Sequence, residues 1–493
     1  MSDDSGTPPH RGRGVLKNTA ALAVARLIDR GSTLVVALLI ASTLGADGLG
    51  AYSIAMAVYG VIVLAGDAGM TMYLIREISR DIARTGTYIV HLSVVGVVVS
   101  VTLTGLALLV VPHLGYAPEV EASVMIIVLA ILPRTLNSIQ EAAFVAHGRT
   151  ELQTVTTFVT TTTYLGLSVW LLGSGHGVTS LITTYVVIQY VITAIYFVLI
   201  RRSISRLPLQ FQWSVARRLV SELKSFAGSS TLAAFLARPE ILILSFLASE
   251  REVGYYSAAI RVAEVWVFIP QVFMNNVFPL LSRSFHTQDG RFASIQRRAM
   301  RAVLAYTLPL TAGMLAAAPL IVTTLFGDSF APAADLLRVL GVNVTMYSLS
   351  SIFWRSLAAR DRQDAVLKVQ VVMILARLGG GALLIIAYGA LGAAVSATAS
   401  SALSFALLAR ATRRSGTSAP SPLVAWRFAA AAGLMGLVTL ALTPWLALWA
   451  LVPVAAAVYV GTTVRLHAFT PDDVALLRSA RSWSGTRRAT RAP

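Results

Sequence analysis

The hydrophobic pattern of this chain is regular: long apolar stretches alternate with short polar segments from residue 16 to residue 464. A helix needs about 20 mostly apolar residues to cross the hydrocarbon of a bilayer. The pattern therefore predicts fourteen membrane-spanning helices, near residues 16–43, 51–75, 87–111, 122–146, 152–172, 178–200, 225–248, 254–281, 300–321, 332–354, 365–387, 390–409, 425–443 and 446–464.

Turn sequences set the boundaries of several predicted helices. They are "SGHG" at 174–177, "GDSFAP" at 327–332, "YGALG" at 388–392 and "LTPW" at 442–445. Phe428 to Val464 carries no charged residue and is too long for one crossing. We therefore divide this segment near Pro444 into a helical hairpin.

Composition supports this pattern. The chain is 56% hydrophobic and 13% charged, whereas soluble proteins carry about 25% charged residues. This balance indicates an all-α polytopic membrane protein. The polar opening "MSDDSGTPPHRGRG" has no apolar core or cleavage site, so we expect the first helix to act as the insertion signal. The absence of cysteine excludes disulfides and thiolate metal sites.

The basic residues are distributed asymmetrically. With the N-terminus in the cytoplasm, 32 of the 40 Lys and Arg residues fall in predicted cytoplasmic segments or in the first four residues of the spans that follow them, and one, Arg251, falls in an opposite loop. Basic cytoplasmic loops are the usual mark of orientation in membrane proteins. We therefore predict that both termini are cytoplasmic, and interpret the net charge of +17 as topology rather than as nucleic-acid binding.

The predicted loops are too short for a soluble catalytic domain, and no G-x-x-x-x-G-K-[ST] motif for nucleotide phosphates occurs. We expect a protein that is not an enzyme and that uses no cofactor or metal. A glycan polymerase or ligase would need a longer external loop with carboxylates.

The two halves of the chain resemble each other. "GAYSIAMAV" at 50–58 matches "GYYSAAIRV" at 254–262, and "AHGRTE" at 146–151 parallels "ARDRQD" at 359–364. "YAP" at 116–118 also parallels "FAP" at 330–332, and "GVTSLITT" at 177–184 parallels "GAAVSATA" at 392–399. The four matches occur in the same order in both halves. A duplication with six helices per repeat predicts two pseudo-symmetric bundles around a central cavity, as in alternating-access transporters.

This organisation predicts seven regions. They are a cytoplasmic tail (1–15), an N-terminal six-helix bundle (16–200), a cytoplasmic linker (201–224), a C-terminal six-helix bundle (225–409), a cytoplasmic loop (410–424), two extra membrane helices (425–464) and a basic cytoplasmic tail (465–493).

At several motifs the chain resembles the Wzx-type polysaccharide flippases of the multidrug/oligosaccharidyl-lipid/polysaccharide exporter superfamily. The resemblance covers roughly residues 15–410. It rests on Leu44-Gly45 before Gly50-Ala51-Tyr52, Asp67-Ala68-Gly69, Arg76-Glu77, Gly254-Tyr255-Tyr256, Pro279-Leu280-Leu281-Ser282, Ala359-Arg360-Asp361-Arg362, Tyr388-Gly389 and Gly392-Ala393-Ala394.

The resemblance implies a bacterial plasma-membrane flippase. Such a protein moves polyprenyl-(pyro)phosphate-linked oligosaccharide from the cytoplasmic to the outer leaflet for cell-surface polysaccharide synthesis. Its partners would be this lipid-linked glycan, membrane lipids, a proton or sodium ion, and glycosyltransferases or a polymerase, and we expect a monomer. An ion-coupled drug or cation exporter and a lipid II flippase are the alternatives. The first helix, "DRGSTLVVALLIASTLG", departs from the Ser-Arg and Gly-x-x-Arg-Asp signature of lipid II flippases.

Arginines inside predicted spans are candidates for binding the headgroup phosphate. A central Arg costs roughly 2.5–3.5 kcal/mol to insert, so it usually faces the protein interior or water. A guanidinium can bind phosphate oxygens through two parallel hydrogen bonds. The candidates are Arg26, Arg30, Arg134, Arg238 and Arg377.

An alternative interpretation pairs the charges within helices. Arg261 with Glu264, and Asp335 with Arg338, are three residues apart, and Arg134 shares a face with Glu141 two turns on.

Acids inside the spans are candidates for ion coupling. Glu240 follows Pro239, whose missing N–H frees carbonyl groups near midspan, and Asp67 lies between glycines in "GDAG". The candidates are Asp29, Asp67, Glu240 and Glu264.

Overall fold

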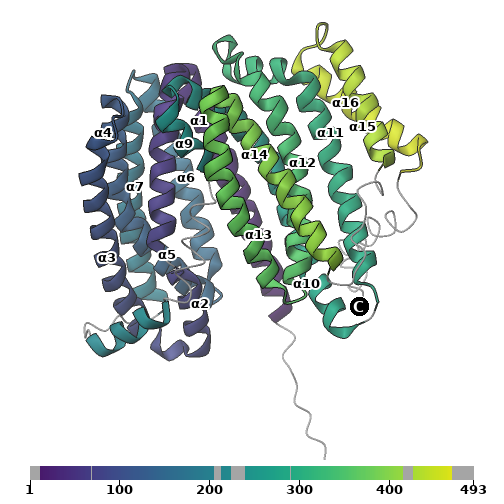
Figure 1. Ribbon diagram of the computed structural model, residues 1–493. Coiled ribbons are helices and arrows are strands. Elements are labelled where there is room, and N and C mark those ends of the chain that lie inside the picture. The colour runs from purple at the N-terminus through teal and green to yellow at the C-terminus, as the bar shows by residue number, and fades with distance from the viewer. Residues whose placement is uncertain are drawn as a thin grey trace, which may run out of the picture. The chain divides into compact units, whose positions relative to one another are not determined.

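The computed structural model describes residues 11–67, 69–204, 212–223, 239–288, 290–414 and 426–468, with side chains from residue 31 onward. All regular secondary structure in these ranges is helical (Figure 1). The chain divides into two compact units, residues 1–257 and 258–493, which we describe separately.

Within its described residues, unit 1 holds nine helices and the beginning of a tenth. An unlabelled helix at 213–223 follows α7. The others are α1 (Arg11–Asp67), α2 (Met70–Arg80), α3 (Thr85–Val110), α4 (Pro118–Ile127), α5 (Ile131–Ala146), α6 (Thr150–Gly173), α7 (Val178–Ser203), α9 (Pro239–Leu247) and the start of α10 (Glu250–Thr287). Short 3-10 turns connect some of them, at Ile82–Arg84, Val111–His113 and Val128–Ala130.

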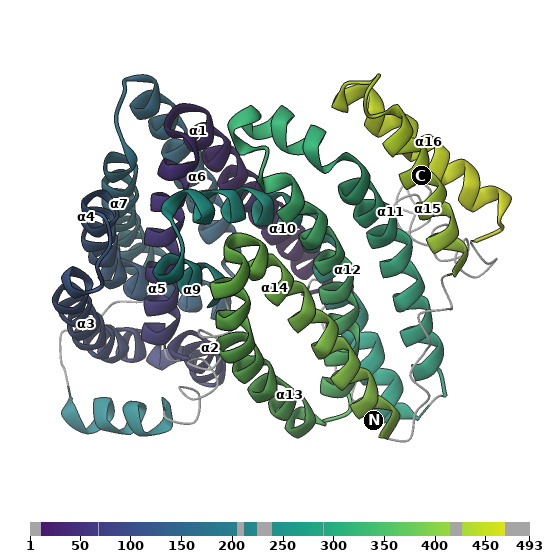
Figure 2. The ribbon, with the colours of Figure 1, turned by 45° about the horizontal axis from the view of Figure 1, so that its top comes forward.

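Unit 2 contains the rest of α10 and the helices that follow it. They are α11 (Phe292–Phe326), α12 (Ala333–Ala358), α13 (Gln363–Leu375), a π-helical turn (Ala376–Gly380), α14 (Gly381–Arg414), α15 (Trp426–Leu442) and α16 (Leu448–Arg465). A 3-10 turn at Asp328–Phe330 precedes α12. The helices α15 and α16 form an antiparallel pair beside α11, with Pro444 in their connection (Figure 2). The hairpin that we predicted there is confirmed.

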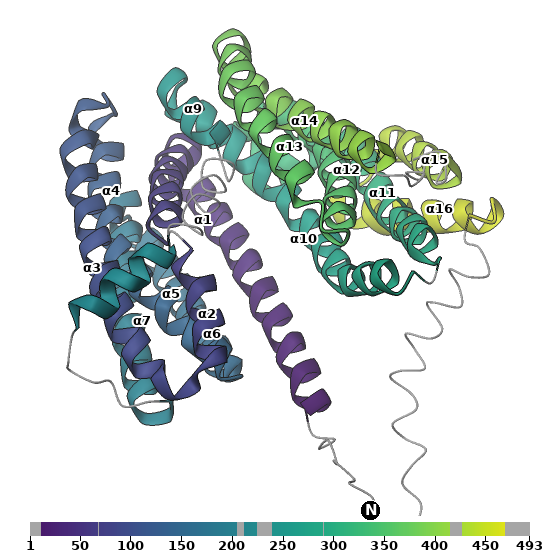
Figure 3. The same cartoon turned by 60° about the horizontal axis from the view of Figure 1, so that its bottom comes forward.

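Ten helices in the described ranges are long and apolar enough to cross a membrane. Two of these ten are merged pairs. Gly45 (φ 69°) divides α1 into two arms (Figure 3), and Gly389 (φ 55°) reverses the chain within α14, where Gly392 returns against Leu384. Glycine reaches positive φ without steric cost, so each pair is joined with almost no loop. The helix α15 is shorter but apolar, and α9 is the described end of the span predicted at 225–248.

The internal duplication is visible in the backbone. At the end of α5 the amide of Arg149 donates to the carbonyl of Phe144, and at the end of α12 the amide of Arg362 donates to that of Leu357. The residue before each arginine has positive φ, 68° at Gly148 and 57° at Asp361. The same turn therefore ends both helices, and it relates α5 to α12 by an offset of 213 residues.

A second pair of equivalent segments makes reciprocal contacts inside unit 1. A Cβ atom on Gly50 would lie 1.9 Å from the carbonyl oxygen of Glu250, and one on Gly254 would lie 2.0 Å from that of Ala46. Arg251 donates to Asp47 at 2.8 Å, across a separation of 204 residues. Only glycine allows the two backbones to approach this closely. The contact relates the beginning of α10 to the second arm of α1 by an offset of 204.

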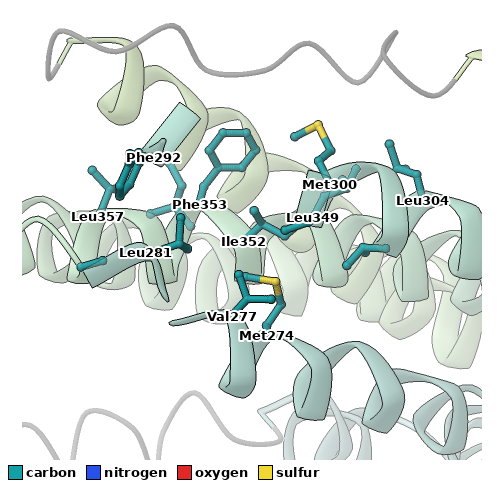
Figure 4. Close-up of a cluster of buried hydrophobic side chains, with 14 of the residues drawn as sticks. Met274, Val277, Leu281, Phe292, Met300, Leu304, Leu349, Ile352, Phe353 and Leu357 are labelled. Atoms are coloured by element: carbon teal, nitrogen blue, oxygen red, sulfur yellow. The ribbon is translucent and has the colours of Figure 1, made fainter. Parts of the chain in front are cut away.

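Each unit has its own apolar core. In unit 1, Tyr73 and Leu74 of α2 pack with Phe144 of α5 and Tyr196 of α7. In unit 2, side chains of α10, α11 and α12 interdigitate, among them Met274, Val277, Leu281, Met300, Leu304, Leu349, Ile352 and Phe353 (Figure 4). This second core packs α10, α11 and α12 together and so fixes the positions of these helices within unit 2.

Candidate functional site

An arginine–glutamate pair lies on α5 in unit 1. Nη1 of Arg134 is 3.1 Å from Oε1 of Glu141, and the two side chains are 35% and 19% exposed. The residues are seven apart, so both project from one face of the helix. The pairing of Arg134 with Glu141, which the sequence offered as an alternative to phosphate binding, is therefore present. It compensates the charge of Arg134 within its own helix.

Asp67 lies beside this pair. Its Oδ1 accepts hydrogen bonds from Thr71 (2.6 Å) and from Ser138 (3.4 Å), and Ser138 lies one turn from Arg134 on α5. Asp67 is the last residue of α1, and α2 begins after Gly69, which has positive φ. The helix break leaves backbone groups without helical partners, so hydroxyls and a carboxylate gather here.

Four tyrosines continue the polar region of unit 1. The ring of Tyr185 lies edge-on to Tyr59 (5.8 Å between centroids) and to Tyr164 (5.7 Å). The hydroxyl groups of Tyr164 and Tyr52 are 3.3 Å apart. Tyr59 and Tyr185 are close enough to Arg134 to interact with its charge. The region thus combines one ion pair, one further carboxylate and several phenols.

The equivalent positions of unit 2 carry different chemistry. The offset of 204 relates Asp67 to Gln271, and the offset of 213 relates Arg134 to Tyr347 and Glu141 to Trp354. Nε2 of Gln271 donates to the hydroxyl of Tyr347 at 3.3 Å. Pro270 interrupts the hydrogen bonding of α10 at this level, as the break after Asp67 does in unit 1.

One turn further along α10, Asn275 is bound to an arginine. Nη2 of Arg355 donates to Oδ1 of Asn275 at 2.8 Å, and Nη1 donates to the carbonyl of Ser351 at 3.4 Å. Trp354 lies beside Arg355, with the guanidinium carbon 5.7 Å from the ring centroid. Both hydrogen-bond acceptors of Arg355 are neutral, so these contacts do not cancel its positive charge.

The remaining residues predicted for the site occupy separate positions. Arg377 lies half-buried on the π-helical turn, a feature that is frequent at functional sites. Glu240 is buried in the first turn of α9, and Glu264 is half-buried on α10, one turn from the buried Arg261. Arg338 forms an ion pair with Asp335 at the start of α12, as the alternative interpretation of the sequence predicted.

Four predicted residues fall where the structure gives no side chains. Arg26, Asp29 and Arg30 belong to the first arm of α1, but their side chains lie outside the described residues, and Arg238 lies outside them altogether. Within the described ranges, no three His, Cys, Asp or Glu residues are placed to hold a metal ion.

Sequence reasoning missed five residues of unit 2: Gln271, Asn275, Tyr347, Trp354 and Arg355. Four of them are neutral, whereas the residues chosen from the sequence were all charged, and Arg355 falls just beyond the predicted span 332–354. The duplication could have identified three of these residues, because its offsets relate them to Asp67, Arg134 and Glu141.

A family model described as "Polysaccharide biosynthesis protein" matches residues 39–335, well over half of the chain. The chain belongs to the polysaccharide biosynthesis protein family. A second family model, "Lipid II flippase MurJ", matches residues 240–467 of this polysaccharide biosynthesis protein. A curated relative, the "Probable low-salt glycan biosynthesis flippase Agl15" of Haloferax volcanii, is 24% identical over 398 residues, which are 79% of this chain and 81% of that protein.

Solved structures share the fold of this polysaccharide biosynthesis protein. The lipid II flippase MurJ in an inward closed conformation is similar with a TM-score of 0.72 and 15% identity, covering 89% of this chain and 97% of that one. An inward-facing multidrug resistance MATE family transporter of the MOP superfamily gives a TM-score of 0.65 and 14% identity, covering 79% and 96%. The predicted all-α multi-pass membrane fold is confirmed.

Proposed function

We propose that this protein is a flippase that moves polyprenyl-(pyro)phosphate-linked oligosaccharide from the cytoplasmic to the outer leaflet of a bacterial plasma membrane by alternating access. Its membership of the polysaccharide biosynthesis protein family supports the glycan pathway. The glycan flippase named for the curated relative supports the same task. Both termini lie in the cytoplasm in this proposal.

The observation that carries the proposal is the pair of equivalent polar sites in the two units, whose residues lie within predicted spans except for Arg355, which directly follows one. One contains Asp67, Arg134 and Glu141, and the other contains Gln271 and Arg355. Charged and amide side chains are costly in hydrocarbon and are expected to border a polar pathway. Moving a charged headgroup with attached sugars requires such a pathway, whereas the polyprenyl tail can remain in lipid.

The headgroup site includes Arg26, Arg30, Arg134, Arg238 and Arg377 in this proposal. Within the part of the chain that has described side chains, Arg355 joins them because its hydrogen-bond acceptors are neutral. Asp67 is our leading coupling residue, since its carboxylate lies at a helix break with two hydroxyl donors. Asp29, Glu240 and Glu264 are the other candidates for binding a proton or sodium ion.

We further propose that the protein works as a monomer beside glycosyltransferases or a polymerase of the same pathway, and that it makes or breaks no covalent bond. A lipid II flippase is the second candidate function. The MurJ family match over residues 240–467 and the fold of MurJ favour it. The departure of the first helix from the lipid II flippase signature argues against it.

Deletion of the gene, followed by analysis of lipid-linked intermediates, tests the proposal. The proposed function predicts that a polyprenyl-linked oligosaccharide accumulates on the cytoplasmic leaflet and that cell-surface polysaccharide is lost. If lipid II alone accumulated, the result would favour a lipid II flippase over an oligosaccharide flippase. Unchanged lipid intermediates together with increased drug sensitivity would overturn both and favour an exporter.

A further inference from the structure

We propose that the face shared by α10 and α12 in unit 2 is a saccharide-binding site, which binds the sugar attached to the pyrophosphate of the transported lipid. This site, formed by Gln271, Asn275, Tyr347, Trp354 and Arg355, is called the α10/α12 face below. The proposal rests on the proposed function and adds to it the place where the glycan is recognised.

The hydrogen bonds place these side chains on one continuous surface. Gln271 reaches Tyr347, and Asn275 reaches Arg355 one turn further along α10. On α12, Tyr347 and Trp354 are seven residues apart and project from the same side. Both residues are 40% exposed, so their side chains are accessible to a ligand.

The position of this face within the predicted spans indicates what surrounds it. Gln271 and Asn275 lie in the predicted span 254–281, where an amide facing acyl chains would have no water to replace its hydrogen bonds. The exposed side of α10 carrying Ile269, Phe273 and Leu280 suits lipid contact instead. The α10/α12 face is therefore expected to border an aqueous pathway.

The chemistry of the face suits a sugar joined to an anion. A pyranose ring has an apolar C–H face that packs on aromatic rings, and its hydroxyl rim exchanges hydrogen bonds with planar amides. Trp354 and Tyr347 supply the rings, and Gln271 and Asn275 supply the amides. Arg355 adds a positive charge next to Trp354, where the phosphate that follows the first sugar can bind.

The duplication provides an independent argument. The offsets place Arg134 and Glu141 of unit 1 at the positions of Tyr347 and Trp354. The same framework therefore holds a compensated ion pair in one unit and two half-exposed rings in the other. If these rings had a purely structural role, we would expect them to pack into the adjacent core, whose members Leu349, Ile352 and Phe353 are at most 3% exposed.

The test compares two radiolabelled lipids, a polyprenyl pyrophosphate that carries N-acetylglucosamine and the same lipid without sugar. Binding to the detergent-solubilised full-length protein is measured by scintillation proximity. The unmodified protein should bind the glycolipid about tenfold more tightly than the bare lipid, because one aromatic contact with a few hydrogen bonds supplies about that factor. Trp354→Ala should abolish the difference, so that the variant binds the glycolipid no more tightly than the bare lipid.

Trp449→Ala is the matched control, because Trp449 lies on α16 and is 81% exposed. It should retain the tenfold preference. Tyr347→Phe keeps the ring, loses the bond from Gln271 and should retain part of the preference. Equal binding of both lipids by the unmodified protein, or a preference that survives Trp354→Ala, would overturn the saccharide site. Failure of both lipids to bind would overturn the proposed function itself.

Discussion

On α5, positions 134 and 141 hold an arginine and a glutamate, whereas the equivalent positions 347 and 354 on α12 hold a tyrosine and a tryptophan. The charge of Arg134 is met within its own helix by Glu141. Among the described residues, the hydrogen bonds of Arg355 go to an amide and to a backbone carbonyl, both of which are neutral. Duplication has thus preserved a framework while its two copies have acquired different chemistry.

The comparison separates two roles that a flippase needs. A compensated ion pair beside Asp67 can respond to a cation without attracting an anion strongly. An arginine with neutral acceptors, next to half-exposed aromatic rings, suits an anionic sugar phosphate. We therefore expect ion coupling at Asp67 in unit 1 and recognition of the sugar next to the phosphate at the α10/α12 face in unit 2.

The largest expected effect comes from breaking the ion pair of unit 1. Glu141→Ala leaves Arg134 without its partner and should destabilise the protein by about 2 kcal/mol, less than the 3–5 kcal/mol typical of fully buried pairs, because both side chains are partly exposed. Trp354→Ala, at the equivalent position, should cost less than about 1 kcal/mol. Unfolding of the solubilised protein by denaturant measures both.

Two controls accompany this prediction. Glu151→Ala removes an exposed glutamate from the first turn of α6 and should change stability by less than about 0.5 kcal/mol. Arg134→Ala combined with Glu141→Ala should be less destabilising than the sum of the single changes, since no unpaired charge remains. Strict additivity would contradict the ion-pair interpretation.

The second prediction introduces an ion pair into unit 2 like the one in unit 1. Asn275→Asp gives Arg355 a carboxylate partner and cancels its charge, so binding of sugar-free polyprenyl pyrophosphate should weaken about tenfold, or about 1.4 kcal/mol. Asn276→Asp is the matched control, because it adds the same charge on the neighbouring residue, whose amide donates to Val272 instead. If both variants weakened binding of the lipid equally, the added negative charge alone would explain the loss. The proposed role of Arg355 would then be contradicted.

A smaller effect distinguishes the two equivalent turns. Gly148 and Asp361 both have positive φ, at 68° and 57°. Asp361→Gly should stabilise the protein by about 0.5 kcal/mol, and Gly148→Ala should destabilise it by about 1 kcal/mol, because only glycine adopts this conformation without strain. Thermal unfolding of the two variants measures the difference. Equal shifts of the same sign would contradict the equivalence of the turns.

The smallest effect concerns the helix at 213–223, between the two repeats. Hydrogen bonds from Tyr73 and Arg218 hold the pKa of Glu222 below its usual 4.5. A lowered carboxylate pKa stabilises the folded state at neutral pH, and the contribution is lost as the pH falls through the lowered value. Glu222→Gln should therefore loosen this helix slightly at pH 7 and make no difference well below pH 4.5.

Hydrogen exchange of residues 213–223, compared between the variant and the unmodified protein at each pH, measures this effect. Arg217→Gln is a suitable control, because Arg217 is exposed on the same helix. A difference between Glu222→Gln and the unmodified protein that persists unchanged in acid would contradict the assignment.

Much of the fold could be predicted from the hydrophobic pattern, because membrane helices are long and uniformly apolar. The hairpin at Pro444 and the duplication were visible in the sequence. The breaks at Gly45 and Gly389 fall between spans that the sequence predicts, but their tightness appears only in the backbone, since the sequence gives no sign of a glycine's φ angle. The domain boundaries that we assigned stay a prediction.

The candidate site was only partly predictable. Asp67 and Arg134 were identified because buried charges are costly, and the partner of Arg134 followed from helical spacing. Gln271, Tyr347 and Trp354 escaped notice because amides and aromatic rings are common in membrane helices. Their role depends on contacts between α10 and α12, which no single-helix pattern contains.

The central claim is tested most directly by transport in proteoliposomes of the purified protein. A polyprenyl pyrophosphate carrying fluorescent N-acetylglucosamine is placed in the membrane, and its accessibility to an impermeant quencher is followed over time. The account predicts protein-dependent movement of the glycolipid between leaflets, slowed by Asn275→Asp and unaffected by Asn276→Asp. Glycolipid that moves no faster than in protein-free liposomes, while a cationic drug is exported, would contradict it.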